Sequence, residues 1–129
     1  MIERKELSPT MIEPRFLKRE KSVLKVIDVN ETSLQIELYD NGTIDHDTVS
    51  IYLNDQLLFK DIPLTQSAFR RTILLDSTIE VNEISMYAEN LGTIPPNTAI
   101  MIINEGKKRH ELILTSDLNR TATIRLRRK

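Results

Sequence analysis

SLQIELY (residues 33–39) and TVSIYLN (residues 48–54) decide the fold, because apolar residues occupy every second position in both. Alternation over four to eight residues is typical of a strand with one buried face, since successive side chains point to opposite faces of a sheet. A helix with these patterns would spread its apolar residues around its surface. The residues expected on the inner faces of the two strands are Leu34, Ile36, Leu38, Val49, Ile51 and Leu53.

Further runs with strand character follow along the chain. Residues 84–88, 112–114 and 124–126 alternate, whereas residues 73–75 and 99–103 are apolar on both faces. The second kind of run fits a central strand or a short buried helix, and its β-branched content and short length favour a strand. Turn residues separate the runs, without a long amphipathic helix between them. The sequence therefore predicts an all-β protein, an immunoglobulin-like antiparallel β-sandwich of about 7–9 strands.

Two regions of the chain differ in pattern. Residues 1–20 hold Pro9, Pro14 and many charges without a steady apolar period, which predicts an extended or partly disordered N-terminal arm. Within it, residues 16–18 could form a short edge strand. Residues 21–129 are expected to form the β-sandwich domain. The full length of 129 residues is that of one domain with a single core.

Composition argues against several classes of function. The chain has no cysteine, which removes disulfides and thiolate sites, and it has no glycine-rich phosphate loop. No tryptophan is present for a sugar-stacking surface. We therefore expect a non-catalytic protein without a nucleic-acid partner, although the 19 acidic residues leave a carboxylate-based hydrolase as an alternative.

No window is apolar enough for a membrane span, and the first residues show no signal peptide. Either a cytoplasmic protein or a mature fragment of an exported one fits this beginning.

Charge is unevenly distributed along the chain. The net charge is −1, but residues 22–104 carry a net charge of −8 and residues 105–129 carry +5. Such asymmetry can indicate a charged partner. The alternative is that the basic end strand lies beside the acidic middle of the chain, so that the two offset each other.

An acidic loop is expected between the first two strands. Asp40, Asp45 and Asp47 lie within eight residues, and Asn41 adds an amide oxygen. Calcium binds six to eight oxygen ligands held by a flexible loop, so this segment is a candidate calcium site. The spacing is not that of an EF-hand. Alternatively, the same side chains hydrogen-bond to nearby backbone groups and build only a turn.

A second distinctive segment, AENLGTIPPNT, covers residues 88–98. It reads as a strand end, a glycine turn and a rigid Pro-Pro connector. Glu89 and Asn90 could bind a partner or could fasten the loop through hydrogen bonds to backbone donors. Together with Asn41 and His46 of the acidic loop, they are the candidate partner-binding residues, because loops on a rigid scaffold often carry recognition.

Two strings in this chain resemble motifs of one protein family. YDNGTIDHDTVS (residues 39–50) and YAENLGTIPPNTA (residues 87–99) are similar, in this order, to motifs of an immunoglobulin-like β-sandwich module in exported envelope proteins of Gram-negative bacteria. The resemblance covers about residues 20–127. His46 stands where the family often has glycine, so the bend after Asp45 is expected to differ.

The resemblance implies a periplasmic or extracellular location and no enzyme activity. It implies, as partners, another protein or other domains of a larger envelope assembly.

Overall fold

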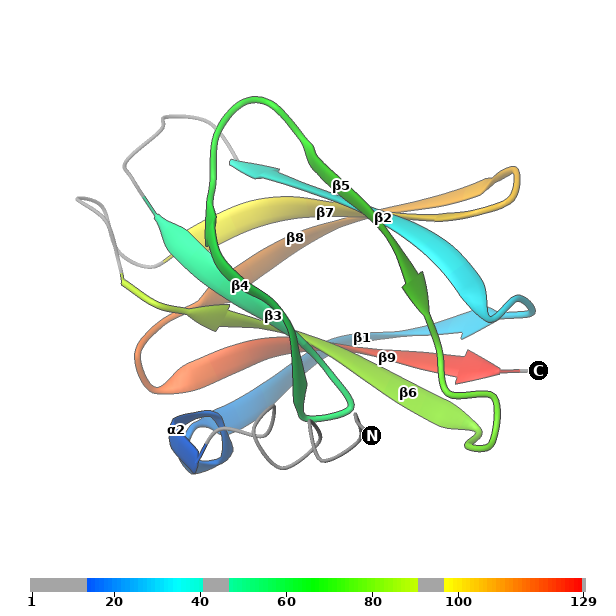
Figure 1. Ribbon diagram of the computed structural model, residues 1–129, viewed down its shortest axis with the longest axis horizontal. Helices are drawn as coiled ribbons and strands as arrows, with labels where there is room; N and C mark the ends of the chain where they lie inside the picture. The colour runs from blue at the N-terminus through cyan, green and yellow to red at the C-terminus, as the bar shows by residue number, and fades with distance from the viewer. Residues whose placement is uncertain (1–13, 41–46, 91–96, 129) are drawn as a thin grey trace, which may run out of the picture.

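Strands make up most of the part of the chain that the computed structural model describes, residues 14–40, 47–90 and 97–128 (Figure 1). In chain order the elements are α2 (Pro14–Lys18), β1 (Glu20–Val29), β2 (Ser33–Asp40), β3 (Thr48–Leu53), β4 (Gln56–Pro63), β5 (Phe69–Leu74), β6 (Val81–Ala88), β7 (Asn97–Glu105), β8 (Lys108–Ser116) and β9 (Arg120–Arg128). The predicted all-β class is therefore confirmed.

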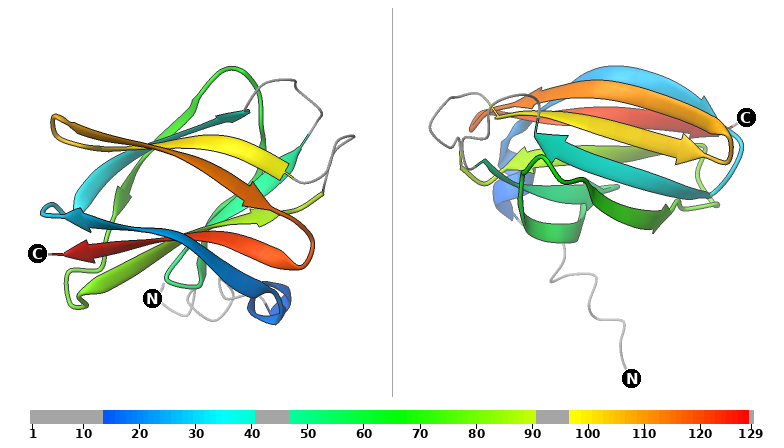
Figure 2. Two further views of the ribbon diagram at one scale, coloured as in Figure 1. Left: turned by 180° about the vertical axis from the view of Figure 1, so that it is seen from behind. Right: turned by 90° about the horizontal axis from the view of Figure 1, so that it is seen from above.

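The strands form two sheets that face each other, as the two views of Figure 2 show. The five-stranded sheet has the order β1-β9-β6-β3-β4, and the four-stranded sheet has the order β5-β2-β7-β8. Neighbouring strands run antiparallel except β1 and β9, which run parallel. This arrangement is a β-sandwich, and it leaves β1, β4, β5 and β8 as the edge strands.

The connections from β2 to β3 and from β6 to β7 both cross from one sheet to the other. Because β2 pairs with β7 and β3 pairs with β6, the two crossings lie at the same end of the sandwich. Asp40 is paired with Ala99, and Val49 is paired with Ala88. The topology therefore brings together the two sequence motifs, which lie about 40 residues apart in the chain.

The core lies between the sheets and contains the residues that the alternating pattern selects. The inner residues of β2 and β3 are all members of one apolar cluster, in which Leu53 is partly buried. Ile84 and Met86 of β6, and Ile124 and Leu126 of β9, complete the same cluster from the five-stranded sheet. Period two in the sequence thus becomes burial of one face of each strand, which is the main stabilising contribution to such a domain.

Two-residue turns close two of the hairpins. Asn54 and Asp55 join β3 to β4 with φ angles of 51° and 69°, a left-handed pair that suits a two-residue hairpin. Gly106 begins the turn from β7 to β8 with φ of 58°, where a side chain would be strained.

The short helix α2 packs on the outer face of the five-stranded sheet. Residues 14–18 form a helix where a short edge strand was considered, and Phe16 is 2% exposed. Its ring stacks on Tyr52 with centroids 3.9 Å apart, and Tyr87 lies 6.1 Å away. One buried aromatic side chain therefore fixes α2 to the sheet, which the irregular pattern of this segment did not reveal. In the described part of the chain, no helix has the length and apolar character of a membrane span.

Candidate functional site

Asp40 and Asp47, two of the proposed calcium ligands, stand at the ends of strands beside the β2–β3 connection. Both are buried, with exposed fractions of 6% and 2%. Their backbones hold the segment that joins β4 to β5, since Asp40 N donates to Thr65 O at 2.8 Å and Asp47 O accepts from Leu64 N at 2.9 Å. Asp45 lies outside the described residues, as do Asn41 and His46. Among the described residues, no three acidic or histidine side chains gather as a metal site.

Glu89 and Asn90 fasten the neighbouring strand. Asn90 Oδ1 accepts from Thr48 N at 3.1 Å, and Thr48 O accepts from Glu89 N at 2.8 Å. Ser50 Oγ donates to Glu89 Oε2 at 2.5 Å. The two sequence motifs are therefore in direct contact, and the side chains of Glu89 and Asn90 are engaged in fixing the ends of β3 and β6.

Two arginines, Arg15 in α2 and Arg19 just after it, tie the helix to the same place. Arg15 donates through both terminal nitrogens to Glu89, each at 2.6 Å. Arg19 lies with its guanidinium 3.7 Å from the centre of the Tyr87 ring and donates to Ala88 O at 2.7 Å. The bidentate ion pair of Arg15 and the stacked guanidinium of Arg19 together fix the orientation of α2 relative to the end of β6.

Ser50 also connects this end of the sandwich to β4. Its Oγ accepts from Asp61 N at 3.0 Å, at a bulge where Asp61 has φ of 54°. The bulge leaves Ser50, which is fully buried, facing a backbone N–H without a ladder partner on β3. A hydrogen-bonded series therefore runs from β4 through Ser50 and Glu89 to Arg15.

Next to this bulge, a groove of about 590 Å³ lies between β4, β5 and the segment that joins them. Its apolar lining consists of Leu58, Phe59, Ile62, Pro63, Ala68 and Phe69. The rings of Phe59 and Phe69 meet edge to face at 5.4 Å, one from each sheet. Both walls are edge strands, so the groove opens along the side of the sandwich where neither sheet continues.

Charged side chains stand around the groove. Lys60 on β4 and Arg71 on β5 are exposed, and so is Asp61. The guanidinium of Arg71 lies 4.3 Å from the centre of the Phe69 ring. Within the described residues neither Lys60 nor Arg71 has a carboxylate partner, in contrast to Arg70, which pairs with Glu37 at 3.2 Å. Arg71 also donates to Arg70 O at 2.6 Å. The groove thus combines an aromatic floor with two cations that have no carboxylate partner among the described residues.

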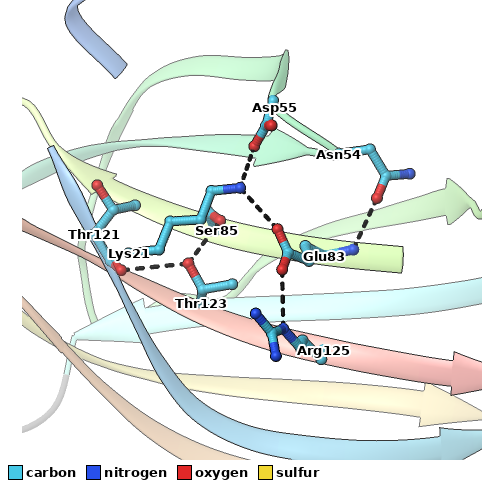
Figure 3. A network of polar contacts seen from close by, with 8 residues as sticks. All are labelled: Lys21, Asn54, Asp55, Glu83, Ser85, Thr121, Thr123 and Arg125. Carbon is cyan, nitrogen blue, oxygen red and sulfur yellow. Dashed lines mark hydrogen bonds and ion pairs between the residues drawn. The ribbon is translucent and has the colours of Figure 1, made fainter. Parts of the chain in front are cut away.

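A separate polar network lies on the outer face of the five-stranded sheet (Figure 3). Lys21 Nζ contacts Asp55 Oδ1 at 2.5 Å and Glu83 Oε1 at 2.7 Å, and Arg125 Nε donates to Glu83 Oε2 at 2.9 Å. Burial alone would raise the pKa of Glu83, but hydrogen bonds from Lys21 and Arg125 outweigh it and hold the pKa below its ordinary value.

Burial lowers the pKa of Lys21, and its contacts with Asp55 and Glu83 outweigh that effect and raise the pKa. These two carboxylates line a cavity of about 440 Å³, yet both are bound to cations. A general acid needs a raised carboxyl pKa, so the network fits structural pairing better than hydrolysis. It also sets basic β9 beside acidic residues, as the charge pattern suggested; Arg127 Nε likewise donates to Asp28 Oδ1 at 2.7 Å.

Comparisons of the chain with protein-family models, with curated proteins and with solved structures find no match. Sequence reasoning selected Glu89 and Asn90 but not Arg15, Phe16 or Arg19. A weak signal existed, because Arg15 and Arg19 stand on either side of Phe16 within five residues of the sequence.

Proposed function

We propose that this chain is a non-catalytic binding or assembly module of a bacterial envelope or secreted protein, and that it holds a protein partner in the groove between β4 and β5. The observation that supports this proposal most strongly is the groove, which lies between two edge strands and is lined by two aromatic rings. Its volume is in the usual range for a binding site, and exposed strand edges are common places for a partner to attach.

The motif contacts support this assignment by making a rigid frame. The backbones of Asp40 and Asp47 form hydrogen bonds with Thr65 and Leu64. Thr65 also lines the groove, so the end of the sandwich where β2 ends and β3 begins adjoins one end of the groove. Ser50 holds the β4 bulge from the other side. In this proposal Glu89 and Asn90 position the scaffold, while the partner contacts lie on β4 and β5.

The finer architecture and the location belong to the same proposal. Parallel pairing of β1 with β9 beside otherwise antiparallel strands, and repeated connections from one sheet to the other, support an immunoglobulin-like sandwich. The resemblance of residues 39–50 and 87–99 to modules of exported proteins supports a periplasmic or extracellular site of action.

Filling the groove tests the proposal. Ala68→Trp places a large side chain in the groove wall, and Thr115→Trp makes the same kind of change at an exposed position on the opposite edge strand β8. Affinity capture from the envelope and secreted fractions of the producing bacterium should recover the same protein with the wild type and Thr115→Trp. Ala68→Trp should recover roughly a tenth or less, as expected when a central contact is blocked. Equal recovery with Ala68→Trp would refute the groove as the binding site, provided that urea unfolding shows all three proteins folded.

A second candidate is a calcium-stabilised structural spacer. It is favoured by the burial of Asp40 and Asp47 on both sides of the connection that contains Asp45. A ligand that binds only the folded state raises the unfolding temperature by mass action. Thermal unfolding with calcium in the millimolar range should then occur several degrees higher than with a chelator, and Asp47→Asn should abolish the difference. An identical transition in calcium and chelator eliminates this candidate.

A further inference from the structure

The two walls of the groove differ in their ability to accept a new strand. Pairing of β4 with β3 shifts register twice, between Val49 and Ile51 and between Ile51 and Tyr52, and β4 ends at Pro63. Pairing of β5 with β2 runs without a shift from Leu38–Phe69 to Ser33–Leu74. Bulges and proline obstruct edge pairing, whereas a regular strand with one open side permits it. The edge available to a partner backbone is therefore β5.

Charge decides which side chains such a strand would carry. Lys60 and Arg71 stand on opposite walls of the groove, and neither is neutralised by a carboxylate of the described residues. Asp61 is the one acidic residue in the described lining, so two cations face one anion. A carboxylate entering between Lys60 and Arg71 would make charge-assisted hydrogen bonds, and an apolar side chain beside it would cover Phe59 and Phe69.

A second copy of this chain fits the edge less well. Antiparallel pairing of β5 with its own copy would place Arg70 and Arg71 of both copies near one another. Like charges on adjacent strands destabilise a sheet, so the edge is suited to a partner of opposite charge.

This inference rests on the proposed function. We propose that the partner contributes an extended, acidic segment that adds to β5 as a further strand of the four-stranded sheet. Main-chain hydrogen bonds to β5 hold the segment. A carboxylate between Lys60 and Arg71 selects it, and an apolar residue two positions along the segment lies on the aromatic floor. Side chains two apart point to the same face of a strand, so one extended segment can supply both.

Three synthetic hexapeptides test this directly. Each alternates valine and threonine, with glutamate, glutamine or lysine at one central position. Titration into the ¹⁵N-labelled full chain should shift the backbone amide signals of β5 with the glutamate peptide. Affinity should be about tenfold weaker with glutamine, the change expected for losing a charged hydrogen bond, and weaker still with lysine.

Charge reversal supplies the internal control. Arg71→Glu should reverse the order, so that the lysine peptide binds better than the glutamate peptide. Arg109→Glu, an exposed arginine on β8, should leave the order unchanged. Equal binding of all three peptides, or amide shifts confined to β1 or β8, would overturn the inference. So would the absence of binding at peptide concentrations of about 1 mM, even if Ala68→Trp still abolishes capture of the natural partner. That combination would leave the proposed function standing and remove only the strand-addition mode.

Discussion

Ser50 joins three parts of the molecule through one hydroxyl group. It accepts a hydrogen bond from the β4 bulge at Asp61 and donates one to Glu89, whose carboxylate is held by Arg15. The serine is fully buried and its own two hydrogen bonds are partly buried, whereas the Arg15–Glu89 pair lies at the surface. A single small polar residue thus connects the groove wall to the N-terminal helix.

Removal of this hydroxyl should be costly for so small a change. Ser50→Ala leaves the Asp61 N–H without its partner and removes one of the two hydrogen bonds to Glu89 Oε2, which still accepts from Arg15. A buried group left unsatisfied costs about 1–3 kcal/mol. Urea unfolding should show a loss of this size for Ser50→Ala and little change for the exposed Ser77→Ala. Equal stabilities of the two variants would show that the Ser50 contacts contribute nothing to the fold.

Glu83 should give the fold a measurable pH dependence. Its lowered pKa means that the folded state binds fewer protons than the unfolded state, so its stabilisation is present above about pH 4.3 and is lost as the pH falls through the folded value. Between about pH 6 and pH 3, unfolding measurements should show a greater loss of stability for the wild type than for Glu83→Gln. Asp76 and Asp117 also have lowered pKa values and act equally in both proteins. Parallel pH curves would contradict the assigned role of Glu83.

At the scale of elements, α2 is fixed mainly by one side chain. Phe16 is buried against Tyr52 and Tyr87, whereas its neighbour Leu17 is 58% exposed. Phe16→Ala should therefore cost about 3 kcal/mol or more, while Leu17→Ala should change stability by less than about 0.5 kcal/mol. Urea denaturation of the two variants distinguishes them. Similar small effects for both would mean that α2 does not pack on the sheet as described.

Strands with one clean face were predictable from sequence, and strands with irregular edges were not. β2 and β3 alternate without interruption, so their inner residues could be named. In β1, the exposed Val23, Leu24 and Val26 surround a register shift and hide the period. In β4 the two bulges have the same effect. A bulge adds a residue to one strand and inverts the alternation beyond it, so period two fails at edges.

The candidate site shows the same limit. Sequence motifs indicated where the crossing connections lie, because turn residues and carboxylates are local signals. The groove could not be predicted, since it needs Phe59 from one sheet and Phe69 from the other. No local sequence pattern indicates that β4 and β5 are edge strands on the same side of the sandwich. The positioning role of Arg15 likewise depends on a contact with Glu89, 74 residues away.

At the scale of the whole molecule, the four edge strands differ in their exposed side chains and in the regularity of their pairing. The edge strand β1 carries exposed apolar residues, β4 is bulged, and β8 exposes Ile113 at 62%. Only β5 combines regular pairing with an adjoining aromatic groove within the described residues. The side of the sandwich at β5 is therefore suited to a partner strand, and the other three edges are less suited.

Hydrogen–deuterium exchange of the full chain, alone and with the captured partner, tests this account most directly. Strand addition replaces water at the backbone of the edge it joins, so the amides of β5 should exchange more slowly in the complex. Those of β1 and β8 serve as internal references and should be unchanged. Protection confined to β1 or β8, with β5 exchanging as in the free protein, would contradict the central claim that the partner binds between β4 and β5.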